Sequence, residues 1–503
     1  MPANDHLQWV EIRDFSGGLW TRDSFLVPPN AAQEMHDCHP VPGGGLRAFY
    51  RRQLLSASTS PSDVGLDPAN EVYLGMFANP SSGINSTCDH YIMAWNTSTR
   101  VPKLYHSNYG AWTVIKSFAA TVASPVLQQS FFTQYVSSLT RKTAFNLNTG
   151  PTGAPGSADD GIWIVTGAGV PTMMTVPGTG ERGPITAHQG RLVVASDDGL
   201  RWTDPGTETF QTSSVLAVEP QTRRPTDILM VGYAPSELLI GKEAGPLIVV
   251  QGDLGDPIVR AMEDSLVLGV GGAPGKTPAG LAVVAERDAV YVTSPGGGVH
   301  NISQQLSPDN FGMPVTSGAY TPKWFGDCLY VNGWLFTPSA VSDMSAWFSA
   351  GHTPGNTDRA FLAFDRSPSV GGVDGAVRAF YVNGNGGASA GGFYELDDTK
   401  RSGLFSFKSA PLRDPGGRQV EVREVQLYAR TYDANATLDV TVGAATRNAV
   451  LAGAGRHQVT MLFREAAEVL DLRLVSTAGT SATNEAPTIE TIRLGWQPRH
   501  LLR

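Results

Sequence analysis

The chain has 503 residues, of which 41% are hydrophobic, 17% are charged, 56 are glycine and 34 are proline. This balance excludes a wholly disordered chain, and the lack of a three-residue glycine period excludes a collagen-like fibre. The formal net charge of −9 has the wrong sign for a protein that grips nucleic acid phosphates broadly. At ~100–200 residues per domain, the length predicts roughly two to four domains.

The lack of targeting signals and the wide spacing of the cysteines bear on the cellular compartment in which the protein is expected. The N-terminal sequence lacks the basic-then-apolar pattern of a signal peptide, and no window approaches the ~18 consecutive apolar residues of a membrane-spanning helix. Cys38, Cys88 and Cys328 lie far apart and form no CxxC pair, so neither a zinc site nor a disulfide framework is predicted. We expect free, largely buried thiols in a reducing cytosol.

Residues 1–52 predict an extended N-terminal arm with one short helix. The helix is expected from Asn30 to Asp37, because Asn30 is a good N-cap residue that follows Pro28 and Pro29. Gln33 then stands where a capping box has its Glu or Gln. The rest of the arm is rich in turns.

Residues 53–401 predict a β-propeller body of about six or seven blades. Short apolar runs of 4–7 residues alternate here with Gly, Pro, Asn and Asp, as in DGIWIVTG, GRLVVASDDGLRW and GDCLYVNGWLFTP. Successive hairpins start about 30–48 residues apart, which is the period of four-stranded propeller blades. A ring of blades hides its sheet edges by repetition. Two or three unrelated sandwiches remain the alternative.

Residues 402–503 predict an antiparallel β-sandwich. Glycine becomes rarer and long alternating strands such as VEVREVQLYARTY and TIETIRLGW follow one another. In the first of these, Val420, Val422, Val425 and Leu427 form the expected inner face, with a bulge at Glu424. The fold class is therefore all-β: an arm, a propeller and a C-terminal sandwich.

The arm contains apolar residues spaced too irregularly for a helix or an isolated sheet. Left in water, they expose a hydrophobic stretch of the kind that marks an interaction site. We expect the arm to clasp a neighbouring subunit, so that its removal leaves a soluble body unable to assemble; the alternative is that it closes a blade of its own propeller. The expected contact residues are Trp9, Phe15, Gly17, Gly18, Leu19, Trp20, Phe25, Pro28, Asp37, Gly45 and Arg47.

The sequence contains no complete motif for catalysis or cofactor binding. The segment VGGAPGKT ends like a phosphate-binding loop, but it lacks the first glycine and Pro278 follows where a helix is required. His36 and His39 flank Cys38 without a fourth metal ligand. A propeller glycosidase needs two carboxylates about 5–9 Å apart, whereas the acids here stand in turn-like sequence. We expect no enzyme activity, no cofactor and no requirement for a divalent metal or nucleotide.

The arm sequence IRDFSGGLWTRDSFLVPPNAAQEMHDCHPVPGGGLRAF resembles the start of the tail nozzle proteins (tail tubular protein B) of short-tailed bacteriophages and related propeller tail proteins. Gly17, Gly18 and Leu19 match a Gly-Gly-aliphatic turn, Pro28, Ala31, Ala32 and Gln33 match the middle, and Gly45, Leu46 and Arg47 match the end. Asp37 replaces the usual Asn, and Ala48-Phe49 replaces Arg-Pro. A second stretch of about 35 residues, from LGVGGAPGKT to GGGVHNIS, looks like the same proteins.

The resemblance implies a structural virion protein of the phage tail, in a nozzle or tail-tip ring that is commonly a hexamer. Such a ring contacts other tail proteins (adaptor or tail tube, fibres or tip), meets genomic DNA only as it passes, and is assembled in the host cytoplasm. Residues 53–401 hold 20 basic and 30 acidic residues, so an acidic channel that repels phosphates is expected. A receptor- or glycan-binding minor tail protein using the sandwich is the alternative, and a propeller hydrolase is the third class considered.

Overall fold

The computed structural model describes most of the chain, in the ranges given below, and the described residues contain β-strands and no helix. Within these residues no helix is available that is long and apolar enough to cross a membrane. The described ranges are 7–20, 26–41, 44–54, 65–67, 70–79, 89–108, 111–119, 132–147, 158–177, 182–196, 199–217, 228–234, 237–242, 247–263, 275–277, 280–285, 289–293, 299–306, 323–325, 328–331, 334–337, 346–349, 361–366, 377–383, 392–401, 404–432, 435–477 and 486–499.

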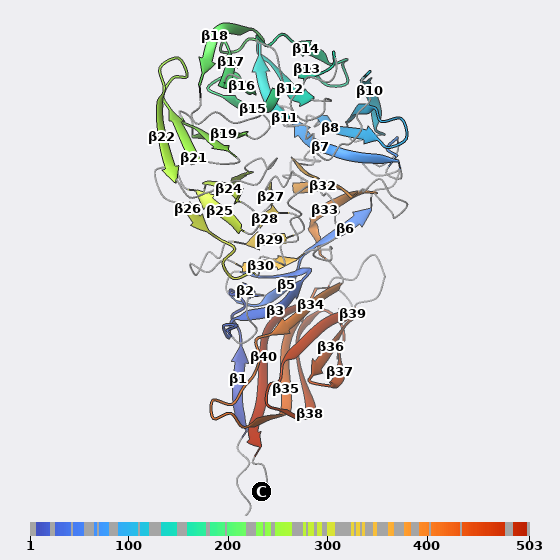
Figure 1. Ribbon diagram of the computed structural model, residues 1–503. Coiled ribbons are helices and arrows are strands. Elements are labelled where there is room, and N and C mark those ends of the chain that lie inside the picture. Colours follow the sequence, from blue (N-terminus) through green and yellow to red (C-terminus); the bar gives the residue numbers. More distant parts are fainter. Residues whose placement is uncertain are drawn as a thin grey trace, which may run out of the picture.

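Seven four-stranded antiparallel units form the body in the described part of the chain (Figure 1). The first four blades are β7 (Glu71–Asn79), β8 (Asp89–Asn96), β9 (Pro102–Ser107) and β10 (Thr113–Ser117); β11 (Phe132–Ser137), β12 (Thr140–Leu147), β13 (Gly161–Val165) and β14 (Thr172–Met174); β15 (Arg182–His188), β16 (Arg191–Ser196), β17 (Gly199–Thr203) and β18 (Phe210–Leu216); and β19 (Ile228–Ala234), β20 (Glu237–Lys242), β21 (Leu247–Gln251) and β22 (Ile258–Glu263).

The remaining three blades include one strand from far away in the sequence. They are β23 (Gly275–Thr277), β24 (Gly280–Ala285), β25 (Ala289–Thr293) and β26 (Val299–Asn301); β27 (Lys323–Phe325), β28 (Cys328–Val331), β29 (Trp334–Thr337) and β30 (Ala346–Ser349); and β31 (Phe361–Arg366), β32 (Val377–Asn383), β33 (Gly392–Arg401) and β6 (Tyr50–Leu54). β6 pairs antiparallel with β33 and completes the seventh blade. The N-terminal segment therefore closes the ring within one chain.

The first strands of neighbouring blades contact one another: β11 meets β15, β15 meets β19, β23 meets β27 and β27 meets β31. β7 contacts both β11 and β31, so the first blade meets the second and the seventh. This arrangement confirms the predicted propeller and sets its blade number at seven, which replaces the alternative of unrelated sandwiches. The propeller core lies between blades: Tyr91 and Trp95 of blade 1 pack in one apolar cluster with Phe145 and Trp163 of blade 2.

Two sheets form the sandwich that follows the propeller, which confirms the second part of the predicted fold. The first sandwich sheet contains β1 (Gln8–Ile12), β4 (Cys38–Pro40), β5 (Leu46–Ala48), β35 (Gln419–Thr431), β38 (Gly455–Ala467) and β40 (Thr488–Arg499). The second sandwich sheet contains β2 (Gly18–Leu19), β3 (Ala31–His36), β34 (Leu404–Ser409), β36 (Ala436–Val442), β37 (Ala445–Leu451) and β39 (Leu472–Thr477).

Strand β35 shows how hydrophobic alternation sets the inner face of the sandwich. Val420, Val422, Val425 and Leu427 are all buried, as the sequence pattern predicts. The pairing register shifts between Val422 and Glu424 against both neighbouring strands, which confirms the predicted bulge. The extra residue keeps the apolar side chains on the core side on both sides of the bulge.

The predicted helix from Asn30 to Asp37 is wrong. Residues Ala31–His36 form strand β3, which pairs with β34 on one side and with β2 on the other. The capping pattern is a local signal, whereas the backbone of β3 is satisfied by partners more than 360 residues away in sequence. Burial of Ala31, Ala32 and Met35 in this pairing outweighs a helix of two turns.

The N-terminal segment also joins the two parts of the molecule. Strand β3 pairs parallel with β30 at His36 and Ser349, so the second sandwich sheet continues into the sixth blade. Phe15 and Leu19 share one apolar cluster with Val290 and Leu306 of the propeller and with the sandwich core. The arm is thus an integral part of the sandwich: β2, β3 and β5 lie where sandwich and propeller meet, and β1 lies beside β40 in the lower sandwich (Figure 1).

Candidate functional site

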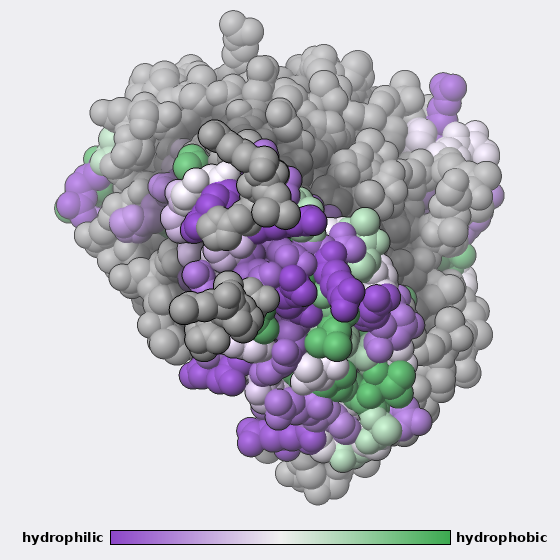
Figure 2. All heavy atoms as spheres, turned by 90° about the horizontal axis from the view of Figure 1, so that it is seen from below, coloured by the Kyte–Doolittle hydropathy of each residue, from purple (hydrophilic) through white to green (hydrophobic). Residues whose placement is uncertain are grey.

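The sequence places all candidate contact residues in the N-terminal segment, and the structure brings this segment onto the sandwich. Trp9 lies on β1 and remains 45% exposed on the outer face of the first sandwich sheet. A Cβ atom on the facing Gly495 would lie 3.1 Å from the Trp9 ring, so glycine leaves the space that the ring uses. Viewed from the sandwich end, the described surface is mainly hydrophilic with smaller hydrophobic patches (Figure 2).

An ionic group stands beside Trp9 on the same strand. The Glu11 carboxylate accepts a hydrogen bond from Arg13 and forms an ion pair with Arg493 at 3.4 Å. The hydrogen bond from Arg13, opposed by desolvation and reinforced by the charges of both arginines, holds the pKa of Glu11 below its ordinary value. Glu11 is therefore ionised at neutral pH and ties β1 to β40.

The Gly17-Gly18-Leu19 motif forms a tight turn that leads into β2. The Gly18 N–H donates to the Phe15 carbonyl at 3.1 Å, and Gly18 adopts a φ of 58°. A Cβ on Gly17 would lie 2.9 Å from the Cβ of Ala31, so only glycine fits there. Leu19 then pairs parallel with Ala32 and is buried. Because Gly17 and Gly18 carry no side chains, β2 can lie directly against β3.

Further along the arm, Pro28, Asp37 and Gly45 also determine the path of the backbone. The Pro28 carbonyl accepts a hydrogen bond from Ala31 at 2.9 Å, just before β3. Asp37, with a φ of 53°, ends β3, and its carbonyl accepts a hydrogen bond from Phe49 at 2.7 Å. Gly45 has a φ of 105°, and a Cβ there would lie 2.9 Å from the carbonyl oxygen of Ile489.

Arg47 is the one matched residue of the arm that carries a positive charge near an exposed aromatic ring. Its guanidinium lies 5.4 Å from the centre of the Tyr432 ring, and Arg430 lies at the same distance. Tyr432 is 42% exposed. Sequence reasoning missed Tyr432 and Arg430, because a strand end 385 residues away gives no local signal that it meets Arg47.

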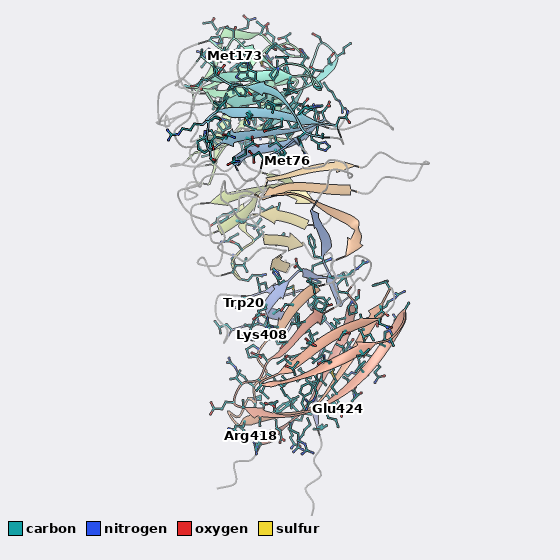
Figure 3. All side chains as sticks on the ribbon, turned by 90° about the vertical axis from the view of Figure 1, so that its right-hand side faces the viewer. Trp20, Met76, Met173, Lys408, Arg418 and Glu424 are labelled. Carbon is teal, nitrogen blue, oxygen red and sulfur yellow. The ribbon has the colours of Figure 1, made fainter. Side chains whose placement is uncertain are left out.

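The expectation that the arm clasps a neighbour is wrong for Phe15 and Leu19, which are buried within their own chain. Phe15 packs edge-on against Phe407 with ring centres 5.3 Å apart, and both rings are buried in the core of the same chain. Leu19 is also buried there, and Trp20 is half-buried near Lys408 at the junction (Figure 3). Phe25 lies outside the described residues. Phe15 and Leu19 therefore find their covering surface within their own chain.

The His36–Cys38–His39 group does not converge on one point. His36 faces Asp37 at 3.4 Å, His39 contacts the Pro40 carbonyl through Nδ1 at 3.0 Å, and the Cys38 thiol donates to the Ser406 carbonyl at 3.4 Å. Burial raises the pKa of the Cys38 thiol well above its ordinary value, so the group is a protonated core residue. In the described part of the chain, no three His, Cys, Asp or Glu side chains form a cluster that can hold a metal ion.

A buried acidic group in the first blade escaped the sequence reasoning. The Glu71 side chain is fully buried, accepts a hydrogen bond from the Tyr105 hydroxyl at 2.6 Å and pairs with Lys103 at 3.1 Å. Burial, together with the hydrogen bond to Glu71 and its charge, raises the pKa of Tyr105, so the phenol stays a donor. The cluster is internally neutralised, and its geometry holds β7 against β9.

We expect the substitution Glu71→Ala to lower the free energy of unfolding by about 1–3 kcal/mol, because it leaves the buried Tyr105 hydroxyl without its acceptor. Denaturant unfolding followed by tryptophan fluorescence measures this loss. Glu208→Ala is the matched control, since Glu208 is 32% exposed and pairs with Lys142 at the surface. That pair is worth about 0–1 kcal/mol. Equal losses of stability in the two variants would contradict a stabilising role for the buried hydrogen bond between Tyr105 and Glu71.

At the free end of the sandwich, Asp414 organises the turn before β35. Its Oδ2 accepts hydrogen bonds from the Gly416 N–H at 3.1 Å, the Arg418 N–H at 3.2 Å and the Arg418 Nε at 2.8 Å. These bonds, led by the side-chain bond from Arg418, hold the pKa of Asp414 below its ordinary value. Arg418 lies at the end of the sandwich remote from the propeller (Figure 3).

We expect Asp414→Asn to lower the melting temperature at neutral pH and to matter less in acid. The folded-state pKa of Asp414 is depressed, so its contribution is complete above the unfolded-state pKa of about 3.9 and is lost as the pH falls through the lower folded-state pKa. Thermal unfolding between pH 7 and pH 3 tests this. Asp439→Asn serves as the control on β36, and a difference between the two variants that is independent of pH would refute the role of ionisation.

Comparisons with known proteins identify no family for this chain. No protein-family model matches the sequence, and no curated protein is significantly similar to it. Among solved structures, the chain is similar to YCF48 bound to a peptide, with 11% identity, a TM-score of 0.36, and coverage of 69% of this chain and 94% of that one. A quinoprotein alcohol dehydrogenase-like protein from Bacteroides thetaiotaomicron has 12% identity, a TM-score of 0.34, and coverage of 66% and 90%.

A third similar structure is the exo-β-1,3-galactanase of Phanerochaete chrysosporium with galactose. Its identity is 10% and its TM-score 0.28, with coverage of 88% of this chain and 100% of that chain. At these levels of identity and superposition, none of the three proteins assigns an activity or a ligand to this chain. The function has to be argued from the chain's own residues.

Proposed function

We propose that the chain is a structural protein of a bacteriophage tail, in a nozzle or tail-tip ring that forms part of the conduit for DNA ejection. The observation that carries the proposal is the run of arm positions resembling tail nozzle proteins. In this run, a Cβ atom on Gly17 or Gly45 would lie 2.9 Å from neighbouring atoms, and Gly18 adopts a left-handed φ of 58°. The resemblance therefore includes glycines whose lack of a side chain lets the arm pack closely onto the sandwich.

The charge distribution supports a passive conduit. Residues 53–401 carry 30 acidic and 20 basic residues, so an assembly that lines a channel with this body repels phosphates and lets DNA slide. In this proposal the protein has no catalytic role. It forms a homo-oligomeric ring, commonly a hexamer, that lies between other tail proteins of the virion. A channel surface with net positive charge would instead favour a role in gripping DNA.

Electron microscopy of the purified full-length protein and of native virions tests the proposal. A ring with a central hole, coaxial with the tail, is the expected image. Peripheral spikes would favour the second candidate, and a free monomer absent from the virion would refute a structural role. Native mass spectrometry gives the ring order independently.

The second candidate function is recognition of a receptor or glycan by the sandwich. Exposed Trp9 and Tyr432 favour it, because exposed aromatic rings can stack on a sugar ring, and the guanidinium groups of Arg47 and Arg430 each lie 5.4 Å from the centre of the Tyr432 ring. Glycan-array binding by the full-length protein, lost in Tyr432→Ala, tests this candidate. Binding that persists in that variant would exclude Tyr432 as the platform.

A further inference from the structure

The first sandwich sheet ends in two strands that pair on one side only in the described part of the chain. Strand β38, with 13 residues, pairs with β35, and strand β1, with five residues, pairs with β40. The two strands lie on opposite sides of the β35–β40 pair (Figure 1). Each therefore presents a row of backbone donors and acceptors for another strand.

Both edges lack proline and lysine, two of the residues that commonly protect a sheet edge from pairing. Proteins commonly block exposed edges with proline, lysine or very short strands. The sequences GRHQVTMLFREAA of β38 and QWVEI of β1 contain no proline and no lysine. The charged residues Arg456, Arg464 and Glu465 lie toward the two ends of β38, which leaves its central stretch, residues 457–463, open to a partner strand.

Two exposed apolar side chains mark these edges, and they lie in one row of the sheet. The pairing register runs from Trp9 through Gly495 and Glu424 to Leu462. Residues in register point to the same face, and Glu424 of this row lies on the lower sandwich (Figure 3). Trp9 is 45% exposed and Leu462 is 71% exposed.

The strand directions make the two edges complementary. Each of the three pairings from β1 to β38 is antiparallel, so β38 runs antiparallel to β1. We propose that β38 of one copy pairs antiparallel with β1 of a second copy, continuing the sheet so that Leu462 faces Trp9 across the junction. In that register Thr460 faces Glu11 and no two like charges meet directly.

This contact is head-to-tail, because it joins two different edges, and such contacts close into rings when the rotation between copies allows. The inference rests on the proposed function, since it names the surface through which the proposed ring assembles. It also reassigns the role expected of the arm: Trp9 makes the contact between copies, while Phe15 and Leu19 build the core of each copy.

Cysteine cross-linking of the full-length protein tests the register. Within one chain Trp9 and Leu462 are three strand spacings apart, roughly 14 Å, which is too far for a disulfide. We expect Trp9→Cys combined with Leu462→Cys to give a ladder of disulfide-linked multimers on oxidation, above the background of the unsubstituted chain. Trp9→Cys with Gln458→Cys is the register control and should cross-link at least about tenfold less, because the two sulfurs are displaced along the strands.

Charged variants test the head-to-tail arrangement. Trp9→Asp leaves the β38 edge intact, and Leu462→Asp leaves the β1 edge intact, so each variant alone should be monomeric. An equimolar mixture should form one-to-one heterodimers and no larger species, because only one good junction remains. Native mass spectrometry of the two variants and their mixture reads out this pattern, and circular dichroism confirms that each is folded.

The outcomes separate this inference from the proposed function. If the unsubstituted protein forms a ring and both Asp variants form the same ring, the junction is wrong and the proposed ring stands. Disulfide dimers from Leu462→Cys alone, with none from the Trp9 pair, would replace it with a symmetric β38–β38 contact. If the unsubstituted protein stays monomeric and does not cross-link, both the junction and the proposed ring are wrong.

Discussion

Deleting residues 1–54 is expected to abolish the soluble fold. The deletion removes β1 to β5 from the sandwich and β6 from the seventh blade. Among the lost side chains, Phe15, Leu19, Met35, Leu46 and Phe49 are buried. At about 1.5–3 kcal/mol for each buried side chain, their loss alone matches the 5–15 kcal/mol that stabilises a typical domain.

This expectation replaces the one drawn from sequence, in which the truncated chain remains a soluble body. Expression yield in the soluble fraction, circular dichroism and thermal unfolding compare the deletion with the full chain. A deletion of residues 1–6 removes no described strand and serves as the control. A truncated protein that stays soluble and melts cooperatively at the same temperature as the full chain would show that the arm is dispensable.

The substitution Phe15→Ala is expected to be the most damaging single truncation in the N-terminal segment, lowering the free energy of unfolding by about 3–5 kcal/mol. Phe15 is 1% exposed and packs edge-on against Phe407, which is equally buried. The cavity lies where the sandwich and the propeller share one apolar cluster, so little chain is free to collapse into it.

Denaturant unfolding of Phe15→Ala, Phe407→Ala and the double variant measures both the loss and the coupling of the rings. We expect a coupling energy of about 0.5–1.5 kcal/mol beyond simple burial. Leu26→Ala is the matched control, since Leu26 is 68% exposed and its removal should change stability by less than about 0.5 kcal/mol. Additive losses in the double variant would mean that the two rings do not stabilise each other.

The N-terminal segment contributes strands to the sandwich and also closes the propeller ring through β6. The last blade takes three strands from 361–401 and its fourth from Tyr50–Leu54. Opening the propeller then requires that this pairing be broken, together with the arm's pairings in the sandwich. The first 54 residues thus couple the stability of the two parts, which a C-terminal closing strand would not do.

The amino-acid sequence by itself determined the all-β fold class and the repeat of the propeller blades. The period of two along β35 and the turn residues between short apolar runs are local signals, because they reflect which side chains alternate between core and solvent. They predicted an all-β chain, a propeller, a sandwich after it and the bulge near Glu424, and the structure confirms each of these. Gly17, Gly18 and Gly45 were also singled out from sequence as positions in tight turns.

Only the tertiary structure decided what the arm does. Ala31–His36 contains a good capping pattern, yet its backbone partners in β34 lie beyond residue 403, and no local pattern reports a pairing at that separation. The same holds for Phe15 against Phe407 and for Glu71 against Tyr105, whose contacts are fixed by topology. The apolar residues of the arm indicate that a surface must cover them. For Phe15 and Leu19, the packing of the whole chain decided that this surface belongs to the same chain, because the long-range strand pairings satisfy backbone and side chains together.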